Sequence, residues 1–360
     1  KLYEIRGVLT REEVHRIASE LLANDVIQQW KIFSRDIWHP ETGIGFPTPK
    51  VILNHNPLVS TIPIHTDEEL KKISIERSLA LRDRDIPIIR DPVPISDGCD
   101  ILIMESTYGN RRHPAYPDSE KELERIVNET ASRGGLLLIP AFAVGRTQQL
   151  VYAFHRLHSE GSIPDLPIFV DSPLATRTTE IFRLHPEVYD AEIREFLLTD
   201  DDNNPFGFGR LQYTQTVEQS KALNSLKFPA IIISCSGMLE GGRILHHLRN
   251  RIGDPRNTIL FTSWQAPNTL GRHIVEGEKT VRIYGEEYTV RAKLEILTGF
   301  SGHADRDGLI DFVRAMRCKP QHTFIVHGEE ESSESLANDL RNELDLENVV
   351  IPEPFQTCEV

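Results

Sequence analysis

The stretch GLLLIPAFAVGRTQQL, residues 135–150, shows the pattern that decides the fold. It begins with a short apolar run, and the residues from Arg146 onward predict a helix over 146–160. Similar apolar runs occupy residues 100–105, 167–171, 229–234, 258–262, 294–298 and 323–327, and further helices are predicted over 118–132, 239–251 and 331–344. Strands that are apolar on both faces and separated by helices are typical of a mostly parallel sheet buried between helical layers. We therefore expect an α/β protein.

Length and composition describe a folded protein with more than one domain. For 360 residues we expect two or three domains, since a domain usually has ~100–200 residues. A hydrophobic content of 39% and a charged content of 26% exclude a largely disordered chain. The net charge of -14 excludes general attraction to nucleic acid, so binding a polyanion would need a local basic groove.

Neither membrane insertion nor export is expected. No apolar stretch approaches the ~18–20 residues of a membrane helix, and the first residues lack a signal-peptide apolar region. The cysteines lie far apart without a C-x-x-C pair, which argues against a disulfide scaffold and fits a reducing compartment. We therefore predict a cytoplasmic protein with no membrane partner. Position 1 is Lys rather than Met, which suggests a processed, truncated or partial chain.

The residues before position 100 have a different pattern. A capping-box spacing followed by apolar residues predicts a helix over 10–32. Prolines and glycines over 34–66 indicate a connecting region, a second helix is expected over roughly 67–81, and three prolines keep 87–94 extended.

Several polar residues stand directly after apolar strands, where open α/β sheets usually place their ligands. They are Glu105, Arg146, Asp171, Ser236 with Gly237, and His327. Any one of them alone is best interpreted as a polar group that bonds to the adjacent loop. Five such positions in register are harder to explain in that way, so they are candidates for a common site.

Glu105 and two histidines are candidates for acid–base catalysis and metal binding. A carboxylate such as Glu105 beside the uncrowded imidazole of His303 would form a general acid–base unit, because the carboxylate fixes the tautomer and raises the histidine pKa. His327, followed by a glycine and a helix, suits a neutral imidazole metal ligand. A purely structural role for each histidine is the alternative, and position alone does not decide between them.

A basic segment could form a local groove that binds a polyanion in spite of the negative net charge. Residues 237–251, GMLEGGRILHHLRNR, place glycines at the start of a helix that carries Arg243. Backbone N–H groups at a helix start, with an arginine nearby, suit a phosphate, and Arg146 opens its helix in the same way. The alternative is a glycine-permitted turn with a solvated basic face. On the functional interpretation, Arg146, Ser236, Gly237 and Arg243 bind the substrate.

The motifs over residues 83–360 closely resemble those of the metallo-β-lactamase-fold RNA nucleases with an inserted β-CASP domain. This is the family of ribonuclease J and of the endonuclease subunit of the cleavage and polyadenylation machinery. The motifs occur in the family's order: ESTYGNR (105–111), IPAFAVGRTQQL (139–150), FVDSPLA (169–175), SGMLEGGRILHHL (236–248), TLGRHIVEG (269–277), FSGHADRDGL (300–309) and FIVHGE (324–329).

This resemblance implies a partial metallo-β-lactamase αββα fold, residues 83–112 and 289–360, interrupted by an α/β β-CASP domain, residues 113–288, with RNA in the cleft between them. It implies that Glu105 is the motif A carboxylate, His303 the motif B histidine and His327 the motif C histidine, a ligand of the second of two zinc ions. By analogy, His303 paired with Glu105 would help protonate the leaving oxygen or hold the phosphate. The implied partner is single-stranded RNA, and we also consider a homodimer.

The sequence departs from the family before Glu105. The family carries an H-x-H-x-D-H zinc motif, a further histidine and a G-D-[LF] aspartate upstream, and none of them is present here. Only single histidines occur in the first 82 residues. Residues 84–94, RDIPIIRDPVP, match what normally follows the missing aspartate, so we place a join near residue 82.

Residues 1–82 resemble part of a phosphoribosylformylglycinamidine synthase large subunit, namely its small N-terminal α/β module and the linker after it. No catalytic residue of that enzyme is covered. A natural fusion, a deletion and a misassembled gene would all look alike in the sequence, and we favour an artificial or accidental join.

The resemblance thus identifies a zinc-dependent RNA phosphodiesterase by descent that retains one zinc ligand. We expect it to be inactive as it stands, because hydrolysis at a two-zinc site needs several ligands for each metal. A non-catalytic RNA-binding β-CASP module is the first alternative. A purine-biosynthesis fragment joined to a foreign segment is the second.

Overall fold

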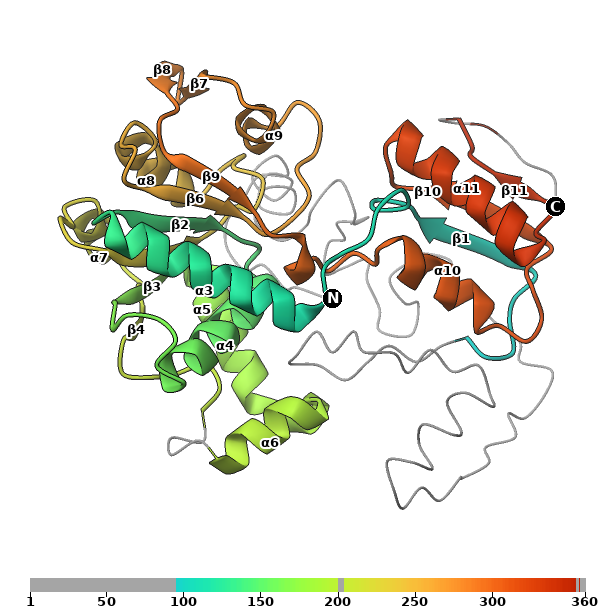
Figure 1. The fold of residues 1–360 in the computed structure, drawn as a ribbon, viewed down its shortest axis with the longest axis horizontal. Coiled ribbons are helices and arrows are strands. Elements are labelled where there is room, and N and C mark those ends of the chain that lie inside the picture. The colour runs from blue at the N-terminus through green and yellow to red at the C-terminus, as the bar shows by residue number, and fades with distance from the viewer. Residues whose placement is uncertain (1–94, 200–203, 354–355, 357–360) are drawn as a thin grey trace, which may run out of the picture. The chain divides into compact units, whose positions relative to one another are not determined.

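The computed structural model describes residues 95–199, 204–353 and 356. They form a six-stranded sheet, a three-stranded sheet and a two-stranded hairpin, with helices packed on the two larger sheets (Figure 1). The predicted helices over 10–32 and 67–81, the connecting region and the extended stretch lie outside the described residues. So does the whole of the 1–82 segment.

The six-stranded sheet is parallel throughout, with the strand order β4-β3-β5-β2-β6-β9. Its strands are β2 (Leu136–Pro140), β3 (Ile168–Asp171), β4 (Leu211–Tyr213), β5 (Ala230–Ser234), β6 (Thr258–Phe261) and β9 (Lys293–Ile296). Every residue of β2, β3, β5 and β6 is buried. The apolar runs therefore form central strands, as predicted.

Both faces of this sheet are covered because alternate residues of each strand point to opposite sides. On β2, Leu137 and Ile139 join the core cluster that includes residues of α3 and α4, whereas Leu136 and Leu138 join a second cluster with Leu223 of α7. The helices of this region are α3 (Tyr116–Ser132), α4 (Arg146–Ser159), α5 (Pro173–Leu184), α6 (Ala191–Thr199), α7 (Val217–Leu223), α8 (Ile244–Arg251) and α9 (Leu270–Val275).

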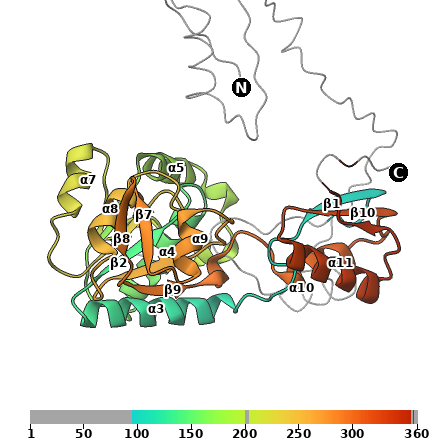
Figure 2. The same ribbon diagram turned by 90° about the horizontal axis from the view of Figure 1, so that it is seen from above.

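The three-stranded sheet joins the two ends of the described chain. Its parallel order is β1 (Ile101–Glu105), β10 (His322–Val326) and β11 (Val349–Val350), so that Glu105 pairs with Val326. The helices α10 (Arg306–Arg314) and α11 (Glu330–Leu344) lie on one side of β1 and β10 (Figure 2). On that side Leu102 and Met104 are buried among them, while Ile103 on the other face of β1 is 67% exposed.

The remaining elements are short. The hairpin consists of β7 (Thr280–Ile283) and β8 (Glu286–Thr289), which pair antiparallel, and two 3-10 turns are η3 (Pro186–Val188) and η4 (Thr298–Phe300). Among the residues that the structure describes, none of the helices combines the length and the apolar character needed to cross a bilayer.

The α/β class with mostly parallel sheets is confirmed, and two details differ from the sequence expectation. The predicted helix over 239–251 begins at Ile244, because Gly242 has φ +77° and a Cβ atom there would lie 2.3 Å from the carbonyl oxygen of Cys235. β9 pairs with β6, although the expected boundary at residue 289 separates them.

Candidate functional site

The pairing of β1 with β10 brings Glu105 and His327 to one end of the three-stranded sheet. Glu105 is the last residue of β1, and His327 follows the last residue of β10 with φ 53°. The next residue is Gly328, where a Cβ atom would lie only 2.2 Å from the hydroxyl oxygen of Ser106. A glycine is required here because the loop after His327 approaches the chain after β1 so closely.

His303 reaches the same place from the loop between η4 and α10. Its Nδ1 atom lies 2.9 Å from a carboxylate oxygen of Glu105, and its ring stacks on that of His327 with 5.4 Å between the centroids. Burial alone raises the pKa of Glu105, but hydrogen bonds from His303 and Thr107 lower it overall. Glu105 is therefore a carboxylate at neutral pH, and it holds the imidazole of His303 in one orientation.

Two residues that support this cluster, Thr107 and Asp305, were missed by the sequence analysis. The hydroxyl of Thr107 donates to the backbone carbonyl of His327 at 3.1 Å and lies 3.2 Å from its Nδ1 atom. The carboxylate of Asp305 caps α10 by accepting from Gly308 and also accepts from the backbone N–H of His113. These contacts fix both histidine loops, and only the adjacency of Thr107 and Asp305 to Glu105 and His303 in the sequence could have suggested them.

A metal ion can be tested against the donors of this cluster. Glu105, His303 and His327 each offer one ligand atom, and these atoms lie within 4.8 Å of one another. Two imidazoles and one carboxylate are a donor set that zinc accepts at a site with three protein ligands. A pair of ions needs several ligands for each, so the three ligand atoms that the described residues supply are too few for two zinc ions.

Asp171 and Arg243 form a separate structural network in the six-stranded sheet. Asp171 is fully buried and accepts from Arg243 Nη1 at 2.8 Å, His247 Nε2 at 2.6 Å, Ser220 at 2.6 Å and Thr214. Burial raises the pKa of Asp171, but these hydrogen bonds together lower it to about 2. The guanidinium of Arg243 also donates to the Gln215 carbonyl, and its role in substrate binding stays a prediction.

Ser236 and Gly237 lie in the loop that follows β5. The Ser236 hydroxyl oxygen accepts from the backbone of Met238 at 3.4 Å, and the Gly237 carbonyl accepts from Gln265 at 3.0 Å. At Gly237 a Cβ atom would lie 3.1 Å from the ring of Phe142, so this loop packs closely against the loop that leads to α4. These contacts are internal to the fold and assign neither residue to a ligand.

The expected single edge of polar residues is divided between two sheets. Glu105 and His327 end strands of the three-stranded sheet, whereas Asp171 and Ser236 follow strands of the six-stranded sheet. Arg146, at the start of α4, approaches the cluster, because its Nη2 atom lies 3.6 Å from the position of a Cβ on Gly302, next to His303.

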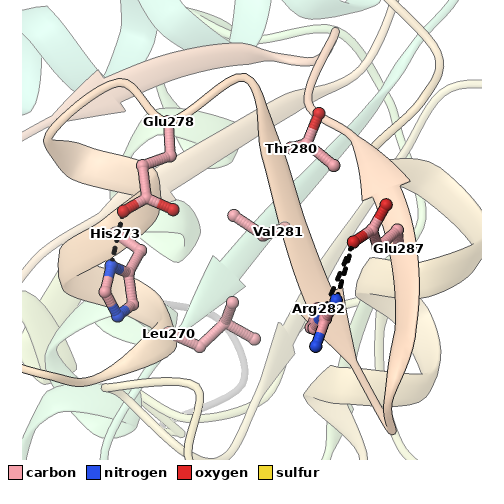
Figure 3. A pocket seen from close by; sticks show the side chains of 7 residues that line it. All are labelled: Leu270, His273, Glu278, Thr280, Val281, Arg282 and Glu287. Atoms are coloured by element: carbon pink, nitrogen blue, oxygen red, sulfur yellow. Dashed lines mark hydrogen bonds and ion pairs between the residues drawn. The ribbon is translucent and has the colours of Figure 1, made fainter.

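A surface pocket lies apart from these residues. It is bordered by α9 and the β7–β8 hairpin, and its polar groups are already paired: His273 with Glu278 at 2.7 Å and Arg282 with Glu287 at 3.0 Å (Figure 3). None of the predicted site residues lines it.

Comparison with known proteins gives two domain matches. Residues 147–274 match the model of the Beta-Casp domain, and residues 287–352 match that of the Zn-dependent metallo-hydrolase RNA specificity domain.

Full-length relatives are longer than the matched region. Ribonuclease TTHA0252 of Thermus thermophilus is 38% identical over 70% of this chain and 56% of its own length. The transcription termination factor FttA of Methanosarcina mazei is 33% identical over 68% of this chain and 39% of its own, and that of Pyrococcus abyssi is 35% identical over 68% and 38%. The chain thus spans about half or less of the length of these curated relatives.

These matches lend no support to the resemblance drawn for residues 1–82. Over residues 147–274 and 287–352, the two domain matches agree with the order of motifs in the sequence and with the parallel α/β architecture. The chain belongs to the β-CASP family of metallo-β-lactamase-fold RNA nucleases.

Proposed function

We propose that this chain binds single-stranded RNA and does not cleave it on its own. The observation that carries the proposal is the Glu105, His303 and His327 cluster, which has an ordered acid–base pair but only three ligand atoms for metal. The match to an RNA specificity domain and the relatives named as a ribonuclease and as termination factors support RNA as the ligand.

Within this proposal the three residues of the cluster have different roles. Glu105 accepts a hydrogen bond from Nδ1–H of His303. When the imidazole is protonated, its Nε2–H is then left to donate to a phosphate oxygen. His327 is the zinc ligand, and a zinc ion bound there would polarise a phosphoryl oxygen as a Lewis acid. The chain carries no H-x-H-x-D-H motif to complete a two-zinc site, which is why we propose that hydrolysis is lost.

Three further statements remain predictions. The division into metallo-β-lactamase segments, residues 83–112 and 289–360, and a β-CASP domain, residues 113–288, is one. The cytoplasmic location and the homodimer rest on the sequence considerations alone.

The proposed function predicts binding without product. A fluorescent single-stranded oligoribonucleotide should bind in an anisotropy titration. Its affinity should fall as the salt concentration rises, and each phosphate contacted should add ~0.7 to the slope of log affinity against log salt concentration. The same RNA, incubated with the chain and zinc, should stay intact on a denaturing gel.

Glu105→Gln is the control for a contaminating nuclease in this assay. Cleavage by the chain that disappears in Glu105→Gln would show that it is an active enzyme. An RNA affinity no greater than that of an unrelated protein of equal net charge would remove RNA as the ligand.

A further inference from the structure

Arg146 is a buried cation with an incomplete set of partners. It opens α4 with only 6% of its surface exposed, and its Nη1 atom donates to Gln149 at 2.5 Å. Its buried Nε–H has no hydrogen-bond partner among the described residues. Burial lowers the pKa of Arg146 to about 10, and the groups that oppose this effect are the hydroxyls of Tyr108 and Tyr116 rather than any carboxylate.

Two other arginines with little exposure are neutralised by carboxylates, whereas the half-buried Arg251 donates to the backbone carbonyls of Leu223, Asn224 and Leu226. Arg243 pairs with Asp171 at 2.8 Å, and Arg306 pairs with Asp339 at 2.8 Å. Burying a charge without an opposite charge is costly, so buried cations in proteins usually have an anionic partner. Arg146 has none within the part of the chain that the structure describes, which points to an anion that comes from outside the protein.

A second buried donor lies close to Arg146. Tyr108 is 2% exposed, and its hydroxyl has no partner of acceptable hydrogen-bond geometry among the described residues. Burial raises the pKa of Tyr108, while hydrogen bonding with Ser301 and the Trp264 backbone and the charges of Arg111 and Arg146 lower it. The hydroxyl therefore lies within the electrostatic reach of the Arg146 guanidinium.

Both donors lie beside the acid–base pair. The Nη2 atom of Arg146 is 3.6 Å from the position of a Cβ on Gly302, the residue before His303. The ring of Tyr108 has its centroid 6.4 Å from that of His303. A buried guanidinium Nε–H without a partner and a buried phenolic O–H without a well-aligned hydrogen bond suit the oxygen atoms of an anion, since charge-assisted hydrogen bonds of this kind are short and strong.

The structure assigns Arg146 and Tyr108 to an anion site that takes one phosphate group next to the Glu105–His303 pair. The assignment of that phosphate to an RNA backbone rests on the proposed function, whereas the anion site itself rests on the two orphan donors. Free inorganic phosphate has the same chemistry, so the two sources are separated by experiment.

The test measures two ligands against matched variants of the full chain. Inorganic phosphate is titrated by calorimetry and by its effect on the melting temperature, and a single-stranded oligoribonucleotide is titrated by anisotropy. The variants are Arg146→Gln, which removes the charge, and Tyr108→Phe, which removes only a hydroxyl. Arg177→Gln, at an exposed position of α5, is the control for the same change in net charge.

Phosphate should bind the unaltered chain and raise its melting temperature. Both Arg146→Gln and Tyr108→Phe should weaken phosphate roughly tenfold or more, as expected for a lost hydrogen bond to a charged group, and Arg177→Gln should change it less than twofold. Tyr108→Phe keeps the test decisive if Arg146→Gln does not fold. RNA affinity should fall in the same two variants if the phosphate belongs to RNA.

Three outcomes separate this inference from the proposed function. Phosphate binding that is absent or equal in all variants would overturn the anion site and leave RNA binding in place. Phosphate binding that weakens in Arg146→Gln and Tyr108→Phe while RNA binding stays unchanged would overturn the assignment of the phosphate to RNA and leave a site for free phosphate. Phosphate binding that depends on Arg146 and Tyr108 in a chain without RNA affinity would support the site and remove the proposed function.

Discussion

Asp171→Asn is expected to lower the free energy of unfolding by about 3–5 kcal/mol, the usual cost of removing one partner from a buried ion pair. Asp171 is fully buried between β3 and α8 and accepts from Arg243 and His247 as well as from two hydroxyls. An asparagine has one acceptor oxygen and would turn its NH₂ toward donors. This loss is a large fraction of the ~5–15 kcal/mol that stabilises a domain.

Asp165→Asn is the matched control for this prediction. Asp165 also pairs with an arginine, Arg210, but both side chains are at least half exposed. Exposed pairs contribute about 0–1 kcal/mol, so this substitution should shift the urea midpoint very little. Equal shifts for the two variants in urea unfolding followed by circular dichroism would show that the Asp171 network does not stabilise the sheet.

The same carboxylate gives the fold a defined response to acid. The pKa of Asp171 is about 2 in the folded chain and near 3.8 in the unfolded chain, so the unfolded state binds its proton first as the pH falls. The stabilisation is fully present above pH ~4 and is lost between pH ~4 and 2, by about 2 kcal/mol. In Asp171→Asn this part of the acid dependence should be absent.

His303→Ala and His327→Ala are expected to separate catalysis from metal binding once a family-type H-x-H-x-D-H half replaces residues 1–82. If His327 is a zinc ligand, His327→Ala should lower zinc content and RNA cleavage together, because an unfilled coordination position weakens the site. If His303 acts with Glu105 as an acid or phosphate-holding pair, His303→Ala should keep the zinc and lose ~10²–10⁴ in rate.

Two further variants make this assignment decisive. Changing Glu105 and His303 together should cost little more than either change alone, because residues that act as a unit are not additive. His322 is the first residue of β10, the strand that ends just before His327. His322→Ala should change neither the zinc content nor the rate of RNA cleavage. Loss of zinc in His303→Ala, or full retention of zinc in His327→Ala, would reverse the two roles.

Much of the architecture could be predicted because it depends on local pattern. The apolar runs that form β2, β3 and β5 have apolar residues at consecutive positions, so apolar side chains point to both faces of the sheet. Such a strand buries all of them only where both faces of the sheet are covered. The predicted start of α8 was wrong because apolar and basic periodicity extends back to residue 239, whereas the conformation of Gly242 delays the start of the helix to Ile244.

The site was harder to predict because its contacts are remote in sequence. The sequence suggested that Glu105 and His303 meet, and the structure brings them together across 198 positions. It could not show that Asp171 and Glu105 stand on different sheets, since strand order is set by tertiary packing. Nor could it distinguish Arg243, which is neutralised by Asp171, from Arg146, which is buried without a carboxylate.

The central claim is that this chain cannot assemble a two-zinc centre, and the metal content of the purified chain tests it most directly. Elemental analysis after gel filtration in zinc-containing buffer should find well under two zinc ions per chain, because the described residues supply three ligand atoms and no H-x-H-x-D-H motif occurs in the sequence. Any zinc that is held should fall in His327→Ala. Two tightly held zinc ions per chain would contradict the account.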